Sequence, residues 1–153
     1  MRIYLNPKFS ALNRPLDDLT SERVRVEAEA MVALLVIVED GLVERFGSEY
    51  REFEVEQDPD GDRVERERSL LALVNRRVPA SPAVARRARA IERVGLLGLD
   101  ALHVASAEAG GAELLVTTDD RKIRRAAGAG RGLHVRLVTP LEAMSLLTGS
   151  EAR

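Results

Sequence analysis

Residues 99–120 read LDALHVASAEAGGAELLVTTDD and carry the clearest structural signal in the chain. Apolar residues occupy nearly every face of 99–109, which indicates a helix buried in the protein. Gly110-Gly111 ends this helix, because paired glycines break regular structure. The apolar run Leu114–Val116 is typical of a short parallel strand buried on both faces.

The segments on either side continue this alternation of strands and helices. Strands are expected over 1–5, 42–46 and 133–138, and helices from about residue 20 to Gly41, from 48 to Pro59, over 60–74, from Pro82 to Gly95, over 121–127 and from Pro140 onward. The alternation predicts an α/β fold with three layers, a short parallel sheet flanked by helices on both faces. We expect a single domain over residues 1–148 and a C-terminal tail over 149–153.

Composition excludes several classes of protein. The 153 residues include no cysteine, so neither a disulfide framework nor a thiolate zinc site is possible. The formal net charge of −2 argues against a general polyanion binder. The longest apolar run, Met31–Val38, is too short to cross a bilayer, and the first residues lack the apolar core of a signal peptide. We therefore expect a cytoplasmic protein without a membrane partner.

Asp100 and Asp119 are the first candidates for a functional site. Asp100 lies in the first turn of the expected buried helix, and Asp119 follows the strand Leu114–Val116. Each acid alone suits the start of a helix, where the macrodipole favours a negative charge. A buried helix that begins with a carboxylate also needs a partner for that charge. A shared Mg²⁺ or Mn²⁺ would serve, because both ions prefer hard oxygen ligands.

These residues also resemble a known family. The segments Leu99–Ala105, Gly110–Ala112 and Leu115–Arg121 are similar to the C-terminal half of a PIN domain, and Arg2–Leu5 with Leu12–Asp18 is similar to one branch of that family. The resemblance implies a metal-dependent ribonuclease of the VapC-like kind found as toxins in bacterial toxin–antitoxin pairs. It further implies RNA as substrate, a small antitoxin protein as partner, and a homodimer.

The resemblance also assigns the members of the acidic site. Asp100 and Asp119 match two of the family's catalytic, metal-binding carboxylates. Glu54 is the best match for a third. The neighbouring glutamates Glu49, Glu52 and Glu56 stay open as alternatives, and so does the interpretation of Glu54 as part of a solvated helix face.

Asn6 is where the chain departs from the family pattern. The family ends its first strand with an aspartate, whereas Tyr4-Leu5 is followed here by Asn6. An asparagine offers a metal one neutral carbonyl oxygen and no charge. Two hypotheses therefore stay open: a ribonuclease in which Asn6 is a weak metal ligand, and a weakened or inactive PIN-like module that binds RNA or protein.

Basic residues follow the second aspartate directly. Arg121, Lys122, Arg124 and Arg125 are candidates for contacts with a nucleic-acid backbone, and Arg86, Arg87 and Arg89 would form a second row. A solvated basic face explains both runs equally well. His103, three residues after Asp100, either orients a carboxylate or is a satisfied core histidine.

Overall fold

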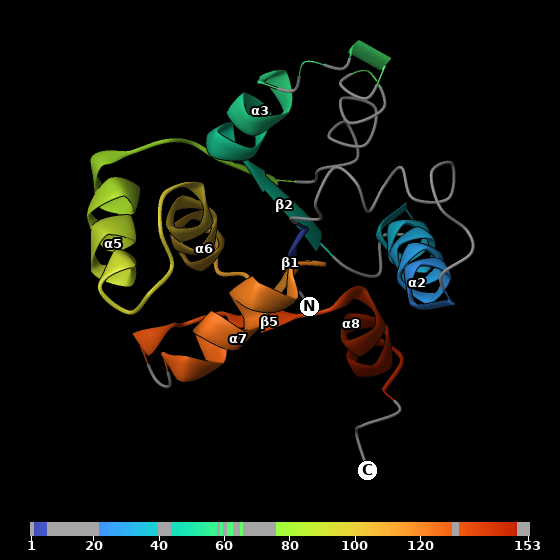
Figure 1. Cartoon of the computed structure of the whole chain (residues 1–153). Helices are drawn as coiled ribbons and strands as arrows, with labels where there is room; N and C mark the ends of the chain where they lie inside the picture. Colours follow the sequence, from blue (N-terminus) through green and yellow to red (C-terminus); the bar gives the residue numbers. More distant parts are fainter. Residues whose placement is uncertain are drawn as a thin grey trace.

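The computed structural model describes residues 2–5, 22–39, 44–57, 59, 61–62, 65, 76–129 and 132–149. Its elements, shown in Figure 1, are β1 (Arg2–Leu5), α2 (Glu22–Glu39), β2 (Glu44–Ser48), α3 (Glu49–Glu56), β3 (Arg76–Val78), α5 (Pro82–Glu92), α6 (Leu99–Ala109), β4 (Leu114–Val116), α7 (Asp120–Gly128), β5 (Arg136–Val138) and α8 (Pro140–Leu147). No helix in this part of the chain is both long and apolar enough to span a membrane.

The five strands form one sheet in the order β3-β2-β1-β4-β5, and every neighbouring pair is parallel. From β1 the chain adds β2 and β3 on one side, and β4 and β5 later extend the other side. The order therefore reverses between β1 and β4. In open parallel sheets, ligands bind at the carboxyl ends of the strands beside such a reversal. Leu5, which ends β1, is in register with Val116, which ends β4.

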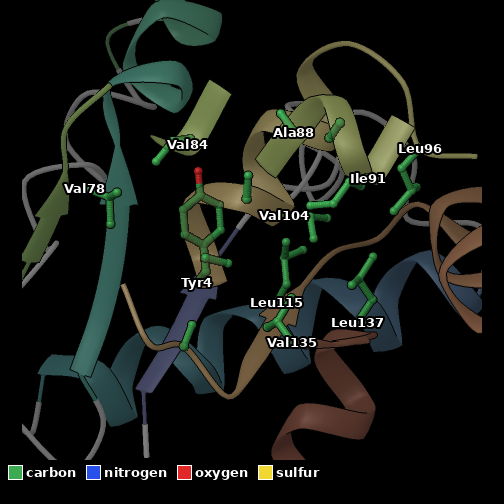
Figure 2. Packing of buried hydrophobic residues seen from close by; sticks show 14 residues of the cluster. Tyr4, Val78, Val84, Ala88, Ile91, Leu96, Val104, Leu115, Val135 and Leu137 are labelled. Atoms are coloured by element: carbon green, nitrogen blue, oxygen red, sulfur yellow. The ribbon is translucent and has the colours of Figure 1, made fainter. Parts of the chain in front are cut away.

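Alternate residues along the strands face two different helical layers. Tyr4, Leu115 and Leu137 pack in a core cluster with α5, α6 and α7 (Figure 2). Ile3 and Val116 pack on the opposite face with residues of α2 and α8. This alternation follows from the twofold repeat of a strand, which sends successive side chains to opposite faces. The expected three-layer α/β/α architecture is confirmed.

Local signals indicate several helix ends correctly. The Ser81 hydroxyl oxygen accepts a hydrogen bond from the Val84 N–H at 3.1 Å, and Pro82 opens α5. Thr139 caps α8 in the same way, through the Glu142 N–H. Serine and threonine satisfy helix N–H groups that have no partner inside the helix.

Some expected elements differ from those observed. The sequence did not predict β3, whose two arginines are exposed and whose Val78 alone is buried. An edge strand with one buried apolar residue leaves no alternating pattern to detect. β2 begins and ends two residues later than expected, and β5 is limited to 136–138. The helix expected over 60–74 lies mostly outside the described residues, as do Asn6 and 150–153.

Candidate functional site

Asp100 and Asp119 both lie at the carboxyl edge of the sheet, beside the strand reversal. Asp119 follows β4 directly, and Asp100 stands in the first turn of α6. Gly98 precedes α6 with φ +58° and ψ −129°, a conformation that L side chains rarely adopt. This turn allows the chain to enter α6 just before Asp100.

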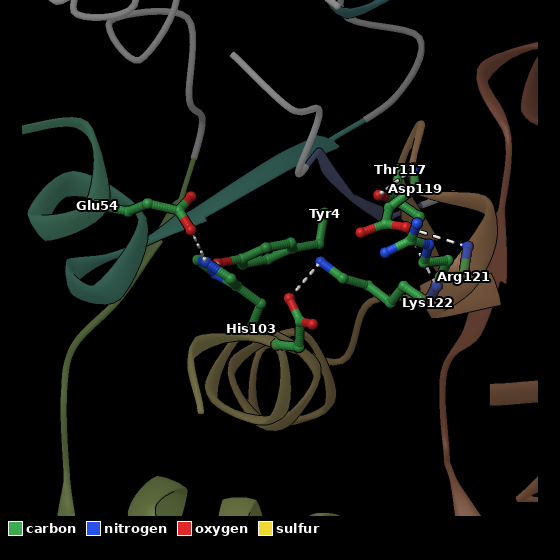
Figure 3. A network of polar contacts seen from close by, with 8 residues as sticks. Tyr4, Glu54, His103, Thr117, Asp119, Arg121 and Lys122 are labelled. Atoms are coloured by element: carbon green, nitrogen blue, oxygen red, sulfur yellow. Dashed lines mark hydrogen bonds and ion pairs between the residues drawn. The ribbon is translucent and has the colours of Figure 1, made fainter. Parts of the chain in front are cut away.

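The Asp100 carboxylate has a cationic partner in this structure. The Lys122 Nζ atom lies 2.9 Å from Asp100 Oδ1 (Figure 3). The Asp100 side chain is 36% exposed, whereas that of Lys122 is only 6% exposed. The partner that the sequence demanded for Asp100 is therefore supplied by the protein itself.

Asp119 caps the helix that carries Lys122. Its Oδ1 atom accepts hydrogen bonds from the backbone N–H groups of Arg121 and Lys122, at 3.0 and 3.4 Å. The Thr117 hydroxyl oxygen accepts a hydrogen bond from the Asp119 N–H at 3.1 Å, which fixes the turn between β4 and α7. The helix-start role expected of Asp119 is thus present. Asp100, Lys122 and Asp119 are called the charged edge below.

A second group of polar side chains lies inside the protein. The Tyr4 hydroxyl is 2.6 Å from Ser48 Oγ and 2.8 Å from His103 Nδ1, and all three residues are fully buried. His103 Nε2 lies 3.5 Å from Glu54 Oε2 (Figure 3). Ser48, Tyr4, His103 and Glu54 are called the buried polar chain below. His103 is therefore a core histidine that also contacts a candidate carboxylate.

The candidate glutamates of α3 have different surroundings. Glu54 faces His103 of α6. Glu52 accepts two hydrogen bonds from Arg77, at 2.6 and 2.9 Å, and Glu49 lies 3.5 Å from the same guanidinium. The hydrogen bond to Glu52 raises the pKa of Arg77 above its ordinary value. Glu54 is thus the glutamate oriented toward the helix that carries Asp100, while Glu49 and Glu52 bind an edge arginine.

The basic residues of α7 do not form one group. Arg121, Arg124 and Arg125 are exposed, but Lys122 is buried against Asp100, contrary to its expected place on the same surface. A helix places successive residues about 100° apart, so Lys122 and the partly buried Ile123 turn inward while the arginines on either side face out.

In the second basic row, Arg87 binds Glu108 at 2.6 Å and the Gly132 carbonyl at 2.6 Å. The hydrogen bond to Glu108 raises the pKa of Arg87, and this arginine joins α5 to α6. Arg87 is therefore engaged within the protein, while Arg86 and Arg89 are exposed.

The residues present can be compared with the needs of a divalent ion. The carboxylates of Asp100, Asp119 and Glu54 are the hard oxygen donors that Mg²⁺ and Mn²⁺ prefer. The Lys122 ammonium already occupies a cation's place at Asp100. Within the described ranges, however, no three acidic or histidine side chains converge closely enough to hold a metal. The donor chemistry of these carboxylates nevertheless fits a divalent metal.

Comparison with known proteins identifies the family. The sequence matches the PIN domain family over residues 10–129, most of the chain. The chain therefore belongs to the PIN domain family, whose members generally depend on a divalent metal. A comparison with curated proteins found no match.

The fold is similar to that in the crystal structure of VapBC2 from Rickettsia felis bound to a DNA fragment from the VapBC2 promoter. The sequences are 13% identical, the TM-score is 0.52, and the match covers 90% of this chain and 98% of the other. At this identity the likeness concerns the fold.

Sequence reasoning missed two features of the site. The pairing of Lys122 with Asp100 was not expected, although Lys122 is one of only two lysines among 23 basic residues. The Tyr4 hydroxyl was not expected to take part either, although it is the polar group of an otherwise apolar Ile3–Leu5 segment. In each case the sequence held a signal in an unusual residue type: a rare lysine at position 122, and a tyrosine hydroxyl at position 4.

Proposed function

We propose that this PIN domain protein is a metal-dependent ribonuclease that cleaves RNA phosphodiester bonds. The observation that carries the proposal is the position of Asp100 and Asp119 at the carboxyl edge of the sheet, beside the strand reversal where α/β proteins bind ligands. Family membership supports it, since both aspartates lie within the residues that match the PIN domain family, 10–129.

The roles of the individual residues follow from their chemistry. Asp100, Asp119 and Glu54 would hold a Mg²⁺ or Mn²⁺ ion, with the Asn6 carbonyl as a neutral ligand. Such an ion lowers the pKa of water and stabilises charge that develops on a phosphate. Thr117 keeps Asp119 in place through the turn hydrogen bond. The exposed Arg121, Arg124 and Arg125 would bind the RNA backbone at positions next to Asp119.

The partners follow from the same proposal. The chain would act in the cytoplasm as the toxin of a toxin–antitoxin pair, as a homodimer inhibited by a small antitoxin protein. The fold similarity to the structure of VapBC2 supports this assignment. Co-expression with the product of a neighbouring small gene, followed by size-exclusion chromatography, tests it. Failure of the two products to elute together would contradict the assignment.

RNA cleavage provides the direct test of activity. Purified protein is incubated with single-stranded RNA and Mn²⁺, and we expect cleavage that EDTA stops and that Asp100→Ala abolishes. Glu113→Ala is a matched control, because Glu113 is exposed and lies just before β4, at the opposite edge of the sheet. Equal activity in Asp100→Ala and in the unmodified protein would refute the proposed site.

A second candidate function is favoured by one observation, the asparagine at position 6. Without a carboxylate there, the protein would be a PIN-like module that binds RNA or protein without cleaving. RNA that stays intact with Mn²⁺ while still binding the protein in a gel-shift experiment would support this function over the first.

A further inference from the structure

Lys122 differs from the other basic residues of its own helix, α7. It is 5% exposed, whereas the neighbouring Arg121, Arg124 and Arg125 in the same helix are exposed. A charged side chain buried to this degree requires an ionic or hydrogen-bonding partner, because desolvation of the charge is costly. The 2.9 Å contact with Asp100 Oδ1 provides that partner.

The position of Lys122 is set by the backbone. Asp119 caps α7 through the N–H groups of Arg121 and Lys122, and the turn is held by Thr117. The first turn of α7 is therefore fixed against the end of β4. Figure 3 shows the Lys122 side chain extending away from this turn. Its ammonium contacts Asp100, in the first turn of α6.

We propose that Lys122 is a built-in cation of the charged edge, which neutralises Asp100 in the metal-free protein and opposes a divalent ion at the same carboxylate. This inference rests on the proposed function, because it concerns the metal of that site.

The burial of Lys122 makes the opposition persistent. An exposed lysine would move its ammonium into water when a metal bound, because separating an exposed ion pair costs little free energy. The aliphatic part of Lys122 is enclosed, so its ammonium stays near Asp100 when the ion binds. Repulsion between a unit charge and a divalent ion about 5 Å apart weakens binding by roughly tenfold, even at the permittivity of water.

Calorimetric titration with Mn²⁺ tests the inference. Lys122→Met keeps the length and helix propensity of the side chain but removes the charge. We expect this variant to bind Mn²⁺ at least about tenfold more tightly than the unmodified protein. Lys122→Arg keeps the charge, and its affinity should stay within about threefold of the unmodified value. Arg136→Met is the matched control, since it removes an exposed charge from β5 and should leave Mn²⁺ affinity unchanged.

A second measurement does not depend on affinity alone. In EDTA, Lys122→Met should unfold at a lower temperature than the unmodified protein, because Asp100 has lost its counter-charge. Mn²⁺ should raise the unfolding temperature more in Lys122→Met than in the unmodified protein, since the ion then replaces a missing cation.

The outcomes separate this inference from the proposed function. Equal, measurable Mn²⁺ affinities in Lys122→Met and in the unmodified protein would overturn the role of Lys122 and leave the nuclease proposal intact. Mn²⁺ binding that survives Asp100→Asn would overturn the proposed site itself. If neither the unmodified protein nor Lys122→Met binds Mn²⁺, both ideas fail together.

Discussion

The charged edge and the buried polar chain each include one residue of α6, and these two residues lie about one helical turn apart in opposite surroundings. Asp100 belongs to the charged edge and its side chain is 36% exposed, whereas His103 belongs to the buried polar chain and is fully enclosed. The buried polar chain joins β1, β2, α3 and α6 through side-chain contacts. The charged edge connects α6 to the first turn of α7.

Polar side chains therefore have two different roles in this protein. Tyr4 and Ser48 are neutral and satisfy one another away from water, so they contribute to stability and to the fixed positions of their strands. Asp100 and Asp119, in contrast, are partly exposed and carry the charges of the candidate site. We therefore expect changes in the charged edge to alter function more than stability, and changes at Tyr4 and Ser48 to do the reverse.

Asp119→Asn should change the function of the protein more than Tyr4→Phe, Asn6→Asp or Arg124→Ala. Asparagine still caps a helix, so α7 keeps its first turn, but the charge is lost. We expect RNA cleavage to fall by at least about a hundredfold while the unfolding temperature changes little. Asp119→Ala is the matched variant: it should lose activity equally and also lose about 0.5–2 kcal/mol of stability with the cap. A stability loss in Asp119→Asn as large as in Asp119→Ala would remove the distinction.

Tyr4→Phe tests the opposite side of the comparison. It removes the hydroxyl that contacts Ser48 and His103, while the ring still fills its place in the core. The free energy of unfolding should fall by about 1–3 kcal/mol, as measured by chemical denaturation. Mn²⁺ affinity measured on the folded variant should stay within about threefold. A loss of Mn²⁺ affinity greater than about threefold would show that the Tyr4 hydroxyl contributes to the metal site.

Asn6→Asp sharpens the description of the charged edge. Asn6 follows Leu5 in the sequence, and Leu5 is in register with Val116, the last residue of β4. An added carboxylate there should tighten Mn²⁺ binding by about tenfold, measured by calorimetry. Unchanged affinity would mean that Asn6 does not belong to the site. Asn6→Ser, which adds no charge, is the control.

Arg124→Ala should produce the mildest change. Arg124 is exposed, and loss of one phosphate contact weakens RNA binding severalfold and reduces the slope of log affinity against log salt by about 0.7 for a single strand. Fluorescence anisotropy at several salt concentrations measures both quantities. Arg136→Ala, on β5, controls for the loss of one exposed positive charge. An identical slope in all three proteins would exclude Arg124 from the RNA contact.

Much of the fold could be predicted because its signals are local. The apolar run Leu114–Val116 and the Ser81-Pro82 helix start depend on a few adjacent residues, and both predict the observed elements. β3 could not be predicted, because Arg76-Arg77-Val78 becomes a strand only through pairing with β2. Its conformation is determined by a neighbour distant in sequence.

Prediction of the candidate site from the sequence has the same limit. The sequence places Asp100 at the start of a helix and Asp119 after a strand, and both residues occupy those positions in the fold. The inward orientation of Lys122 depends on how α7 lies against α6, and no adjacent residue encodes that geometry. The contact between Tyr4 and His103 spans 99 residues of sequence, so composition and periodicity carry no trace of it.

The central position of β1 in the sheet has a consequence for folding during synthesis. β1 lies in the middle of the sheet and is translated before the other described elements, yet one of its two neighbours, β4, begins at Leu114. A ribosome must therefore have released more than two thirds of the chain before β1 can be enclosed. Contacts of such long range fold slowly, because a large loop must close first. A partly synthesised chain that ends before Leu114 lacks both β4 and Asp119, so the candidate site is incomplete until most of the chain has been made.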